Sequence, residues 1–258
     1  MIERFIKNDL TLKRWRRFKK IKRSMISVWV LLLIVFLSVT AEMWANSKPI
    51  IMSYKGEIYM PVYFFTHPSE FGQAGMITDY RDLPMEKGDW AVWPLIEWDP
   101  FETNYEVDSF PSKPTTVNWF GTDDRGRDVA ARLLYGFRYS IGFAILVWLL
   151  SYTIGISIGA TMGFFGGKVD LFGQRVVEVF ETMPILLLLI TLVSIFGASM
   201  SLLVVFASLF GWMLISLYTR GEFLKLRKME FVEAAQAMGA SRVRVIFRHI
   251  LPNALNPV

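Results

Sequence analysis

Three long stretches without a charged side chain constrain this chain more than any other feature of its sequence. They occupy residues 24–41, 139–167 and 182–219 and contain 18, 29 and 38 residues. A helix needs about 20 apolar residues to cross the hydrocarbon core of a bilayer. The third stretch is too long for one crossing, and the segment GASMS at 197–201 interrupts it. The sequence therefore predicts an all-α polytopic membrane protein with four spans, of which the last two are antiparallel and joined by a tight turn.

The rest of the composition argues against catalysis. The chain contains no Cys, which excludes disulfides and thiolate sites. Its two histidines, His67 and His249, lie far apart in the sequence, with no carboxylate cluster placed to join them. The nearest approach to a P-loop has Met162 in place of the first glycine and Val169 in place of Ser or Thr. We therefore predict no catalytic residue, no metal site and no cofactor.

An acidic group before the second stretch is the strongest alternative for a cation site. Asp123, Asp124 and Asp128 lie close together in the sequence, but Arg125 and Arg127 are interleaved with them. We expect these arginines to pair with the carboxylates, which favours a structural role over a metal site.

The distribution of Lys and Arg predicts the orientation of the chain in the membrane, because cytoplasmic segments are enriched in both. Residues 1–23 carry ten basic and two acidic side chains, residues 46–138 carry nine and fourteen, and the 39 residues after Thr219 carry seven basic ones. Both ends are therefore expected in the cytoplasm and the acidic middle outside. Since the net charge of +5 follows this pattern, nucleic acid is not an expected partner.

These boundaries divide the chain into five parts. They are a cytoplasmic basic N-terminus (1–23), a first transmembrane helix (24–45), a periplasmic segment (46–138), three transmembrane helices (139–220), and a cytoplasmic loop followed by the start of a further helix (221–258). The basic run at 13–23 has two interpretations, namely binding of anionic lipid headgroups or a topology signal at the membrane surface. We favour the topology signal.

The outer segment has mixed polarity and many aromatic residues. Residues 50–60 predict a short hairpin that turns at Lys55 and Gly56. Its four tryptophans, together with the prolines at 94, 100, 111 and 114, favour a compact, irregular fold over a linker. The aromatic side chains either grip a ligand or partner or form the small core of the segment, and we favour the core. The tryptophans are Trp90, Trp93, Trp98 and Trp119.

The predicted spans contain packing signals but no ionisable residue. Gly155, Gly159 and Gly163 recur every four residues, so they share one helical face on which another helix can approach closely. Pro184 opens the third span and is expected to kink it. An ion-coupled carrier needs charges inside the membrane. Their absence from the three stretches argues against a secondary carrier or channel, which is the main alternative function.

The segment after the fourth span reads as helix, glycine turn, helix. Residues 230–238 are good helix formers, and Gly239 permits the left-handed backbone that ends a helix. Ser241 is a favourable N-cap for a second helix, and Pro252 marks the start of another segment. Such a short helix pair needs a surface to dock against.

The spacing EAA-x3-G-x9-H-x-LP at 233–252 resembles the cytoplasmic loop of binding-protein-dependent ABC importer permeases, specifically those of the oligopeptide and dipeptide family. The segment NWFGTDDRGRD at 118–128 resembles the stretch before the second span in their C-type subunits. The resemblance implies a type I ABC importer permease fold with a small extracytoplasmic insert, and a coupling helix that sits in a groove of a partner ATPase. The residues that it assigns to ATPase docking are Glu233, Ala234, Ala235, Gly239, Arg242 and His249.

The same resemblance implies the partners of the chain in the bacterial inner membrane. They are a second permease subunit, cytoplasmic ABC ATPase subunits that hydrolyse the ATP, a periplasmic peptide-binding protein, the peptide substrate and the lipid bilayer. It also implies a fifth and a sixth span beyond Val258. The outer segment between the first span and Trp119 is about 70 residues long, which is longer than is typical of the family. In this it resembles a variant subgroup linked with import of peptides and of the antibiotic microcin C. A purely structural membrane subunit is the remaining alternative; its substrate uptake would not change when the loop is mutated.

Overall fold

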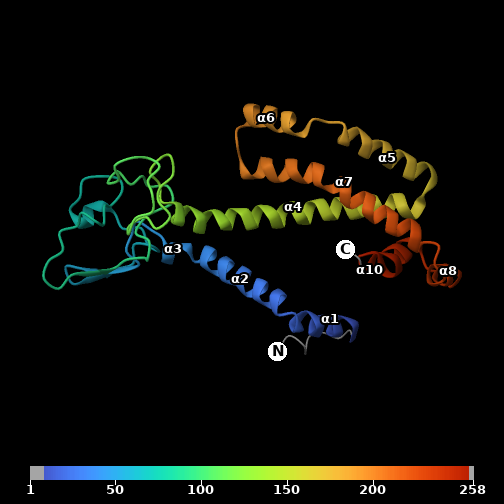
Figure 1. The fold of residues 1–258 in the computed structure, drawn as a ribbon, viewed down its shortest axis with the longest axis horizontal. Helices are drawn as coiled ribbons and strands as arrows, with labels where there is room; N and C mark the ends of the chain where they lie inside the picture. The colour runs from blue at the N-terminus through green and yellow to red at the C-terminus, as the bar shows by residue number, and fades with distance from the viewer. Residues whose placement is uncertain (1–8, 256–258) are drawn as a thin grey trace. The chain divides into compact units, whose positions relative to one another are not determined.

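The computed structural model describes residues 9–255 and is predominantly helical (Figure 1). The chain divides into two compact units, Met1–Ser140 and Ile141–Val258, and the long helix α4 (Val129–Phe165) contributes residues to both. The prediction of an all-α polytopic membrane protein is confirmed, with a small amount of strand confined to the outer segment.

The first unit begins with helices and continues into a small antiparallel sheet of order β2-β1-β3. The predicted hairpin is confirmed: Tyr54 pairs with Glu57, and the two turn residues, Lys55 and Gly56, have φ of 53° and 85°. Positive φ at both positions is the type I′ geometry that two-residue hairpins prefer. The elements are α1 (Asp9–Lys20), α2 (Lys22–Val39), α3 (Ala41–Trp44), β1 (Ile51–Tyr54), β2 (Glu57–Tyr59), the 3₁₀ turn η2 (Pro68–Phe71) and β3 (Trp90–Val92).

Two small cores hold the outer segment together. One is formed by Met52, Tyr54, Phe71, Tyr80 and Leu83 around the sheet. The other joins residues 45–98 to the start of α4 through Ala45, Ile96, Trp98, Ala130 and Ala131.

The expectation that the tryptophans form this core holds for only part of the set. Trp98 is 6% exposed, whereas Trp90 and Trp119 are 46% and 47% exposed. Trp90 and Val92 lie on the same face of β3, and both are exposed, so this face of the strand is open to solvent. The pattern of aromatic residues did not distinguish these positions.

Two helix bounds differ from the uncharged runs. α2 ends at Val39, and residues 41–44 form the separate turn α3 instead of extending the span to 45. α4 begins at Val129, ten residues before the uncharged run. The charged residues in its first turns are paired: Arg138 donates to Glu42 at 2.8 Å, and Arg132 lies 2.9 Å from Asp123. A helix tolerates paired charges, so the run of uncharged residues underestimated its length.

The second unit contains α5 (Gly167–Glu181), α6 (Ile185–Phe196), α7 (Met200–Leu226) and the short helices that follow. Within residues 9–255, α2, α4 and α7 are long and apolar enough to cross a membrane. The fourth span exists only if α5 and α6, bent by 69° at a break that contains Pro184, count together as one. The predicted interruption is confirmed: α6 ends at Phe196, Gly197 has φ of 78°, and Ser199 caps α7.

The glycine face of α4 packs directly on α7. A Cβ on Gly159 would lie 2.3 Å from the Ser216 carbonyl oxygen, and one on Gly155 would lie 2.7 Å from the Trp212 carbonyl oxygen. A Cβ on Gly163 would lie 2.5 Å from the Cβ of Phe223. The packing interpretation of these glycines is confirmed, since only hydrogen fits between the two backbones.

Candidate functional site

The candidate site is the loop after α7, and two arginines hold its base. Arg227 donates from Nη1 to the Phe164 carbonyl oxygen at 3.1 Å, which ties the end of α7 to the end of α4. Arg220 donates from Nη2 to Asp170 of α5 at 2.8 Å and forms an ion pair with it. The helices that lead into the loop are therefore fixed by charge-assisted bonds.

The helix α8 (Glu230–Ala237) has an inner and an outer face. Val232 and Ala235 are 0% and 2% exposed, whereas Glu233 and Ala234 are exposed. Glu230 and Glu233 lie in its first turn, where a negative charge is favourable near the positive end of the helix dipole. Val232 and Ala235 are three residues apart, so they line one face that packs on the chain itself.

The turn after α8 is a Schellman motif. The Gly239 N–H donates to the Gln236 carbonyl at 2.9 Å, and the Ala240 N–H donates to the Ala235 carbonyl at 3.1 Å. Gly239 has φ of 79°, the left-handed conformation that this motif requires. The predicted helix–glycine–helix arrangement is confirmed.

The second half of the loop turns back toward the membrane helices. Ser241 caps α9 (Arg242–Arg244), its Oγ accepting from the Arg244 N–H. A π-helical turn, η3 (Val245–Ile250), leads into α10 (Leu251–Ala254), with Pro252 in its first turn. Proline is tolerated there because the first N–H groups of a helix have no intrahelical acceptor.

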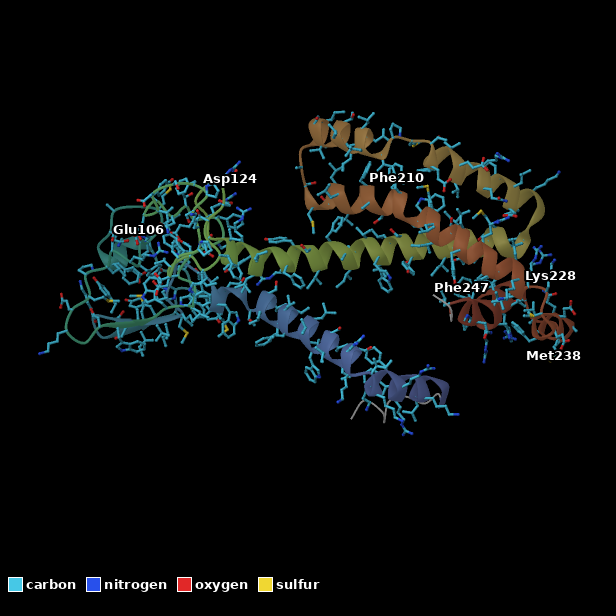
Figure 2. All side chains as sticks on the ribbon, in the orientation of Figure 1. Glu106, Asp124, Phe210, Lys228, Met238 and Phe247 are labelled. Atoms are coloured by element: carbon cyan, nitrogen blue, oxygen red, sulfur yellow. The ribbon has the colours of Figure 1, made fainter. Side chains whose placement is uncertain are left out.

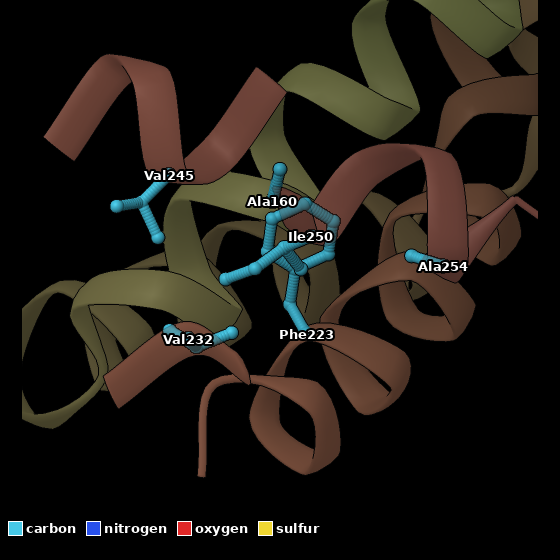
Figure 3. Close-up of a cluster of buried hydrophobic side chains, with 6 residues drawn as sticks. All are labelled: Ala160, Phe223, Val232, Val245, Ile250 and Ala254. Atoms are coloured by element: carbon cyan, nitrogen blue, oxygen red, sulfur yellow. The ribbon is translucent and has the colours of Figure 1, made fainter. Parts of the chain in front are cut away.

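One buried core joins the loop to the membrane helices (Figure 3). Phe223 of α7 and Ala160 of α4 meet side chains of the loop, and four residues of this core are completely buried. The core is formed by Ala160, Phe223, Val232, Val245, Ile250 and Ala254. The surface that the helix pair needs is thus supplied in part by its own chain.

The outer surface of the loop carries large apolar side chains that sequence reasoning did not single out. Met238, Val243 and Phe247 are 82%, 65% and 63% exposed; Figure 2 labels Met238 and Phe247 on this part of the chain. Arg242 is also exposed, and His249 is half-buried in η3. Exposed apolar residues of this size mark interaction surfaces. Met238 is the C-cap of α8, Val243 lies in α9 and Phe247 lies in η3, so no single helical pattern in the sequence marks them.

The predicted docking residues are therefore divided between two environments. Glu233, Ala234, Gly239 and Arg242 are exposed, whereas Ala235 is buried against its own chain. Ala235 supports the turn, since its carbonyl accepts the bond from Ala240.

The second sequence block, 118–128, forms a separate polar network in the first unit. The buried Asn118 donates from Nδ2 to Asp128 Oδ2 at 2.8 Å and accepts from Asn104 at 2.8 Å. Asp128 Oδ1 accepts from the Ala131 N–H at 2.7 Å, so Asp128 caps α4. This block thus fixes where α4 begins.

Asp123 organises the exposed side of the same block. Burial by itself would raise its pKa, but hydrogen bonds from the Arg127 side chain and from the backbone N–H groups of Arg127 and Arg125 outweigh that effect and lower the pKa to about 2. The expected pairing is confirmed for Arg127; Arg125 contributes its backbone. Within residues 9–255, no group of three His, Asp or Glu side chains is arranged to hold a metal ion.

Comparison with known proteins identifies the family. Residues 155–258 match the family described as binding-protein-dependent transport system inner membrane component, and residues 11–61 match the N-terminal transmembrane domain of oligopeptide transport permease C. The inner membrane ABC transporter permease protein YejE of Escherichia coli K12 is 40% identical over 248 residues, which cover 94% of this chain and 73% of that protein. The chain belongs to the oligopeptide-type ABC transporter permeases.

Two further relatives support this assignment. The peptidoglycan transport system permease protein YejE of Agrobacterium fabrum is 35% identical over 95% of this chain and 72% of that protein. The dipeptide transport system permease protein DppC of Lactococcus lactis is 30% identical over 93% of this chain and 65% of that protein. Members of this family are multi-pass inner-membrane permeases and non-catalytic subunits.

Proposed function

We propose that this chain is one of two permease subunits of an ATP-driven peptide importer, and that its loop at 229–254 couples it to a cytoplasmic ATPase. A peptide-binding protein on the other side of the membrane delivers the substrate. The observation that carries the proposal is the two-faced α8, which packs on the membrane helices through Val232, buries Ala235 and exposes Glu233 and Ala234.

This geometry explains how force can reach the membrane helices. Val232, Val245 and Ile250 are completely buried against Phe223 and Ala160. Close-packed interiors transmit displacement because they contain few voids. A push on the outer face of α8 therefore moves α4 and α7 together with it, which is what alternating access requires.

The outer face offers the ATPase two kinds of contact. Glu233 supplies a negative charge, and a hydrogen bond to a charged partner is worth about 1.5–3 kcal/mol. Met238, Val243 and Phe247 supply exposed apolar side chains of the same loop. Gly239 sets the direction in which the chain leaves α8, while Arg242 and His249 belong to the docking set through the family resemblance.

The decisive experiment measures coupling in the full-length permease with its partners. Glu233→Lys should weaken ATPase pull-down and uncouple ATP hydrolysis from peptide uptake while leaving membrane insertion intact. Glu178→Lys is the matched control, because Glu178 is an exposed acid on α5 whose pair with Arg175 lies on the surface. Normal uptake by the Glu233→Lys variant would exclude a coupling role for this face.

The substrate class rests on the names of the relatives. They are a peptidoglycan transport permease and dipeptide transport permeases, which share peptide bonds as the recognised chemistry. We propose peptides as the substrate class and microcin C, suggested by the length of the outer segment, as one candidate cargo. Competition between a labelled dipeptide, a peptidoglycan-derived peptide and microcin C for uptake would rank the three.

The proposed orientation places the N-terminus and α8 in the cytoplasm and the sheet outside. The chain has no native Cys, so a single Cys can be labelled selectively. Ser69→Cys and Met238→Cys are suitable probes; Ser241 is less suitable because its Oγ caps α9. An impermeant reagent should label position 69 but not 238 in intact cells, and the reverse result would invert the proposed topology.

A further inference from the structure

The basic segment before the first span folds as a helix of its own. α1 ends at Lys20 and α2 begins at Lys22, while Ile21 between them is extended, with φ of −85° and ψ of 98°. No Gly or Pro lies at this break. Like charges four residues apart, such as Lys19 and Arg23, oppose a straight helix through it. α1 is therefore a distinct element directly before a membrane span.

The described side chains of α1 form an aromatic strip and a basic face, and Lys19 at the edge of the strip places its Nζ 5.7 Å from the centroid of the Trp15 ring. Leu12, Trp15 and Phe18 recur every three residues and are all half-buried. The rings of Trp15 and Phe18 stack with centroids 5.9 Å apart. Lys13 and Lys20 are exposed on the other side of the helix. A helix with an aromatic strip and a basic face is typical of elements that lie in the membrane interface.

The connection to α2 keeps this helix near the bilayer. α2 is a candidate span, and it begins one residue after Ile21. Residues 13–23 contain eight Lys and Arg and no acid. A helix of 12 residues is about 18 Å long, which is comparable to two Debye lengths at physiological salt. Basic side chains this close to a membrane are attracted to anionic headgroups.

We propose that α1, together with Lys22 and Arg23, is a binding site for anionic phospholipid headgroups. The aromatic strip lies at the boundary of the acyl chains, and the basic face contacts the phosphate groups. This assigns to the segment a ligand in addition to the topology signal expected from charge alone. The inference rests on the proposed function only in placing α2 in a bilayer, and it is independent of peptide transport.

Lipid selectivity of the full chain tests this inference. The purified protein is reconstituted in phosphatidylcholine vesicles that contain a trace of spin-labelled phosphatidylglycerol or spin-labelled phosphatidylcholine. We expect phosphatidylglycerol to associate at least about threefold more strongly. Replacing Lys13, Arg16, Arg17 and Lys20 with Gln should bring the ratio close to one, because Gln removes the charge and retains helix propensity.

A matched control removes the same number of charges elsewhere. Gln at Lys48, Lys55, Lys87 and Lys113 lowers the charge of the outer segment by the same amount. This control should retain the selectivity of the wild type. Equal lipid selectivity in the α1 variant and the wild type would overturn the proposal. Labelling at Ser69→Cys reports the orientation of the α1 variant separately, and an inverted orientation would not change that conclusion.

Depth measurements provide an independent readout. Spin labels at Leu12→Cys and Lys13→Cys should differ in vesicles with phosphatidylglycerol, with position 12 more accessible to oxygen and position 13 to a water-soluble relaxant. Equal water accessibility at the two positions would overturn the interfacial placement. Tighter binding of a single-stranded oligonucleotide than of phosphatidylglycerol headgroups at physiological salt would also overturn it in favour of nucleic acid.

Discussion

At the residue scale, Gly239 shows how one backbone conformation positions the candidate site. Its φ of 79° is positive, yet a Cβ at this position would meet no atom within 4 Å. The requirement for glycine is therefore conformational and does not come from crowding. An L-residue in this region costs about 1–2 kcal/mol. The direction in which the chain leaves α8 depends on that single residue.

This distinction yields a prediction with an internal control. Gly239→Val should destabilise the turn by at least about 1–2 kcal/mol, and it should increase proteolysis of the loop and weaken ATPase pull-down. Gly239→Asn should be close to wild type, because Asn tolerates the left-handed region. If the two variants were equally impaired, the side-chain volume at 239 would matter more than φ.

Asp123 predicts a pH dependence in the first unit. Its pKa is lowered to about 2 in the folded chain, below the ordinary value of 3.8, so ionised Asp123 stabilises the fold above about pH 4. That contribution is lost as the pH falls from about 4 to about 2. In thermal unfolding, Asp123→Asn should be less stable than wild type at pH 6, and the difference should shrink below pH 4.

A neighbouring carboxylate controls for the change in charge. Asp124 is exposed in the same loop, and Asp124→Asn removes one negative charge without removing the bonds to Arg127. If the difference in unfolding temperature between Asp123→Asn and wild type stayed the same down to pH 2, it would contradict the role given to the Asp123 carboxylate.

At the scale of elements, the contact between α4 and α7 depends on three glycines. Gly159→Ala would place a methyl group 2.3 Å from the Ser216 carbonyl oxygen, which must then move. Overpacking of this kind costs about 1–3 kcal/mol. We expect a lower unfolding temperature in detergent and weaker seating of the loop, because Phe223 lies on the same helix as Ser216.

The same helix supplies the control for this prediction. A Cβ on Gly142 would meet nothing within 4 Å. Gly142→Ala should therefore unfold at a temperature equal to or above that of the wild type, since alanine is the better helix former. Tolerance of alanine at both 142 and 159 would show that α4 and α7 separate easily.

The sequence was most informative where a local rule determines the structure. The turn at Gly239, the cap at Ser241 and the hairpin at Lys55 and Gly56 were predicted, because each depends on neighbouring residues alone. The glycine face of α4 was predicted from its spacing, although the helix that packs on it, α7, was not. The start of α4 was not predicted, since Arg138 is accommodated by Glu42, 96 positions away in the sequence. The inward orientation of Ala235 also depends on distant packing.

The candidate site was predicted in its position but not in its two-sided character. The motif at 233–239 located the loop through family resemblance. It did not separate Glu233, which is exposed, from Val232 and Ala235, which are buried, because that division depends on packing with distant parts of the chain, as Val232 shows against Phe223 and Ile250. Periodicity in a helix of eight residues is too short to establish it.

At the scale of the whole molecule, each unit has its own buried residues. The outer segment of the first unit contains two cores, one around the sheet and one that packs on the start of α4. Backbone contacts and one side chain join these two cores. Asn46 donates to the Ile96 carbonyl at 3.0 Å, and Ile96 donates to Trp44 at 2.9 Å. Arg81 pairs with Glu102 and lies over the Trp98 ring, 4.4 Å from its centroid.

This arrangement allows a clean deletion of the insert. Replacing residues 48–94 with a short Gly-Ser linker removes the sheet and its core but keeps Ala45, Ile96 and Trp98 on α4. We expect ATPase association to be unchanged and the affinity for the peptide-binding protein to fall at least about tenfold, or about 1.4 kcal/mol. The reason is that the deleted part is an exposed portion of the proposed outer face with an apolar core of its own, linked to the retained residues by Arg81.

A wider deletion separates loss of docking from loss of folding. Removing residues 50–110 also removes Ile96, Trp98 and Asn104, so the core on α4 and the hydrogen bond to Asn118 are lost. That variant should lose the fixed start of α4 and be degraded, whereas the 48–94 deletion should insert and be recovered at the wild-type level. If the 48–94 deletion retained both wild-type affinity for the binding protein and normal uptake, the insert would have no part in substrate delivery, and the surface for the binding protein would have to lie on the remaining outer residues.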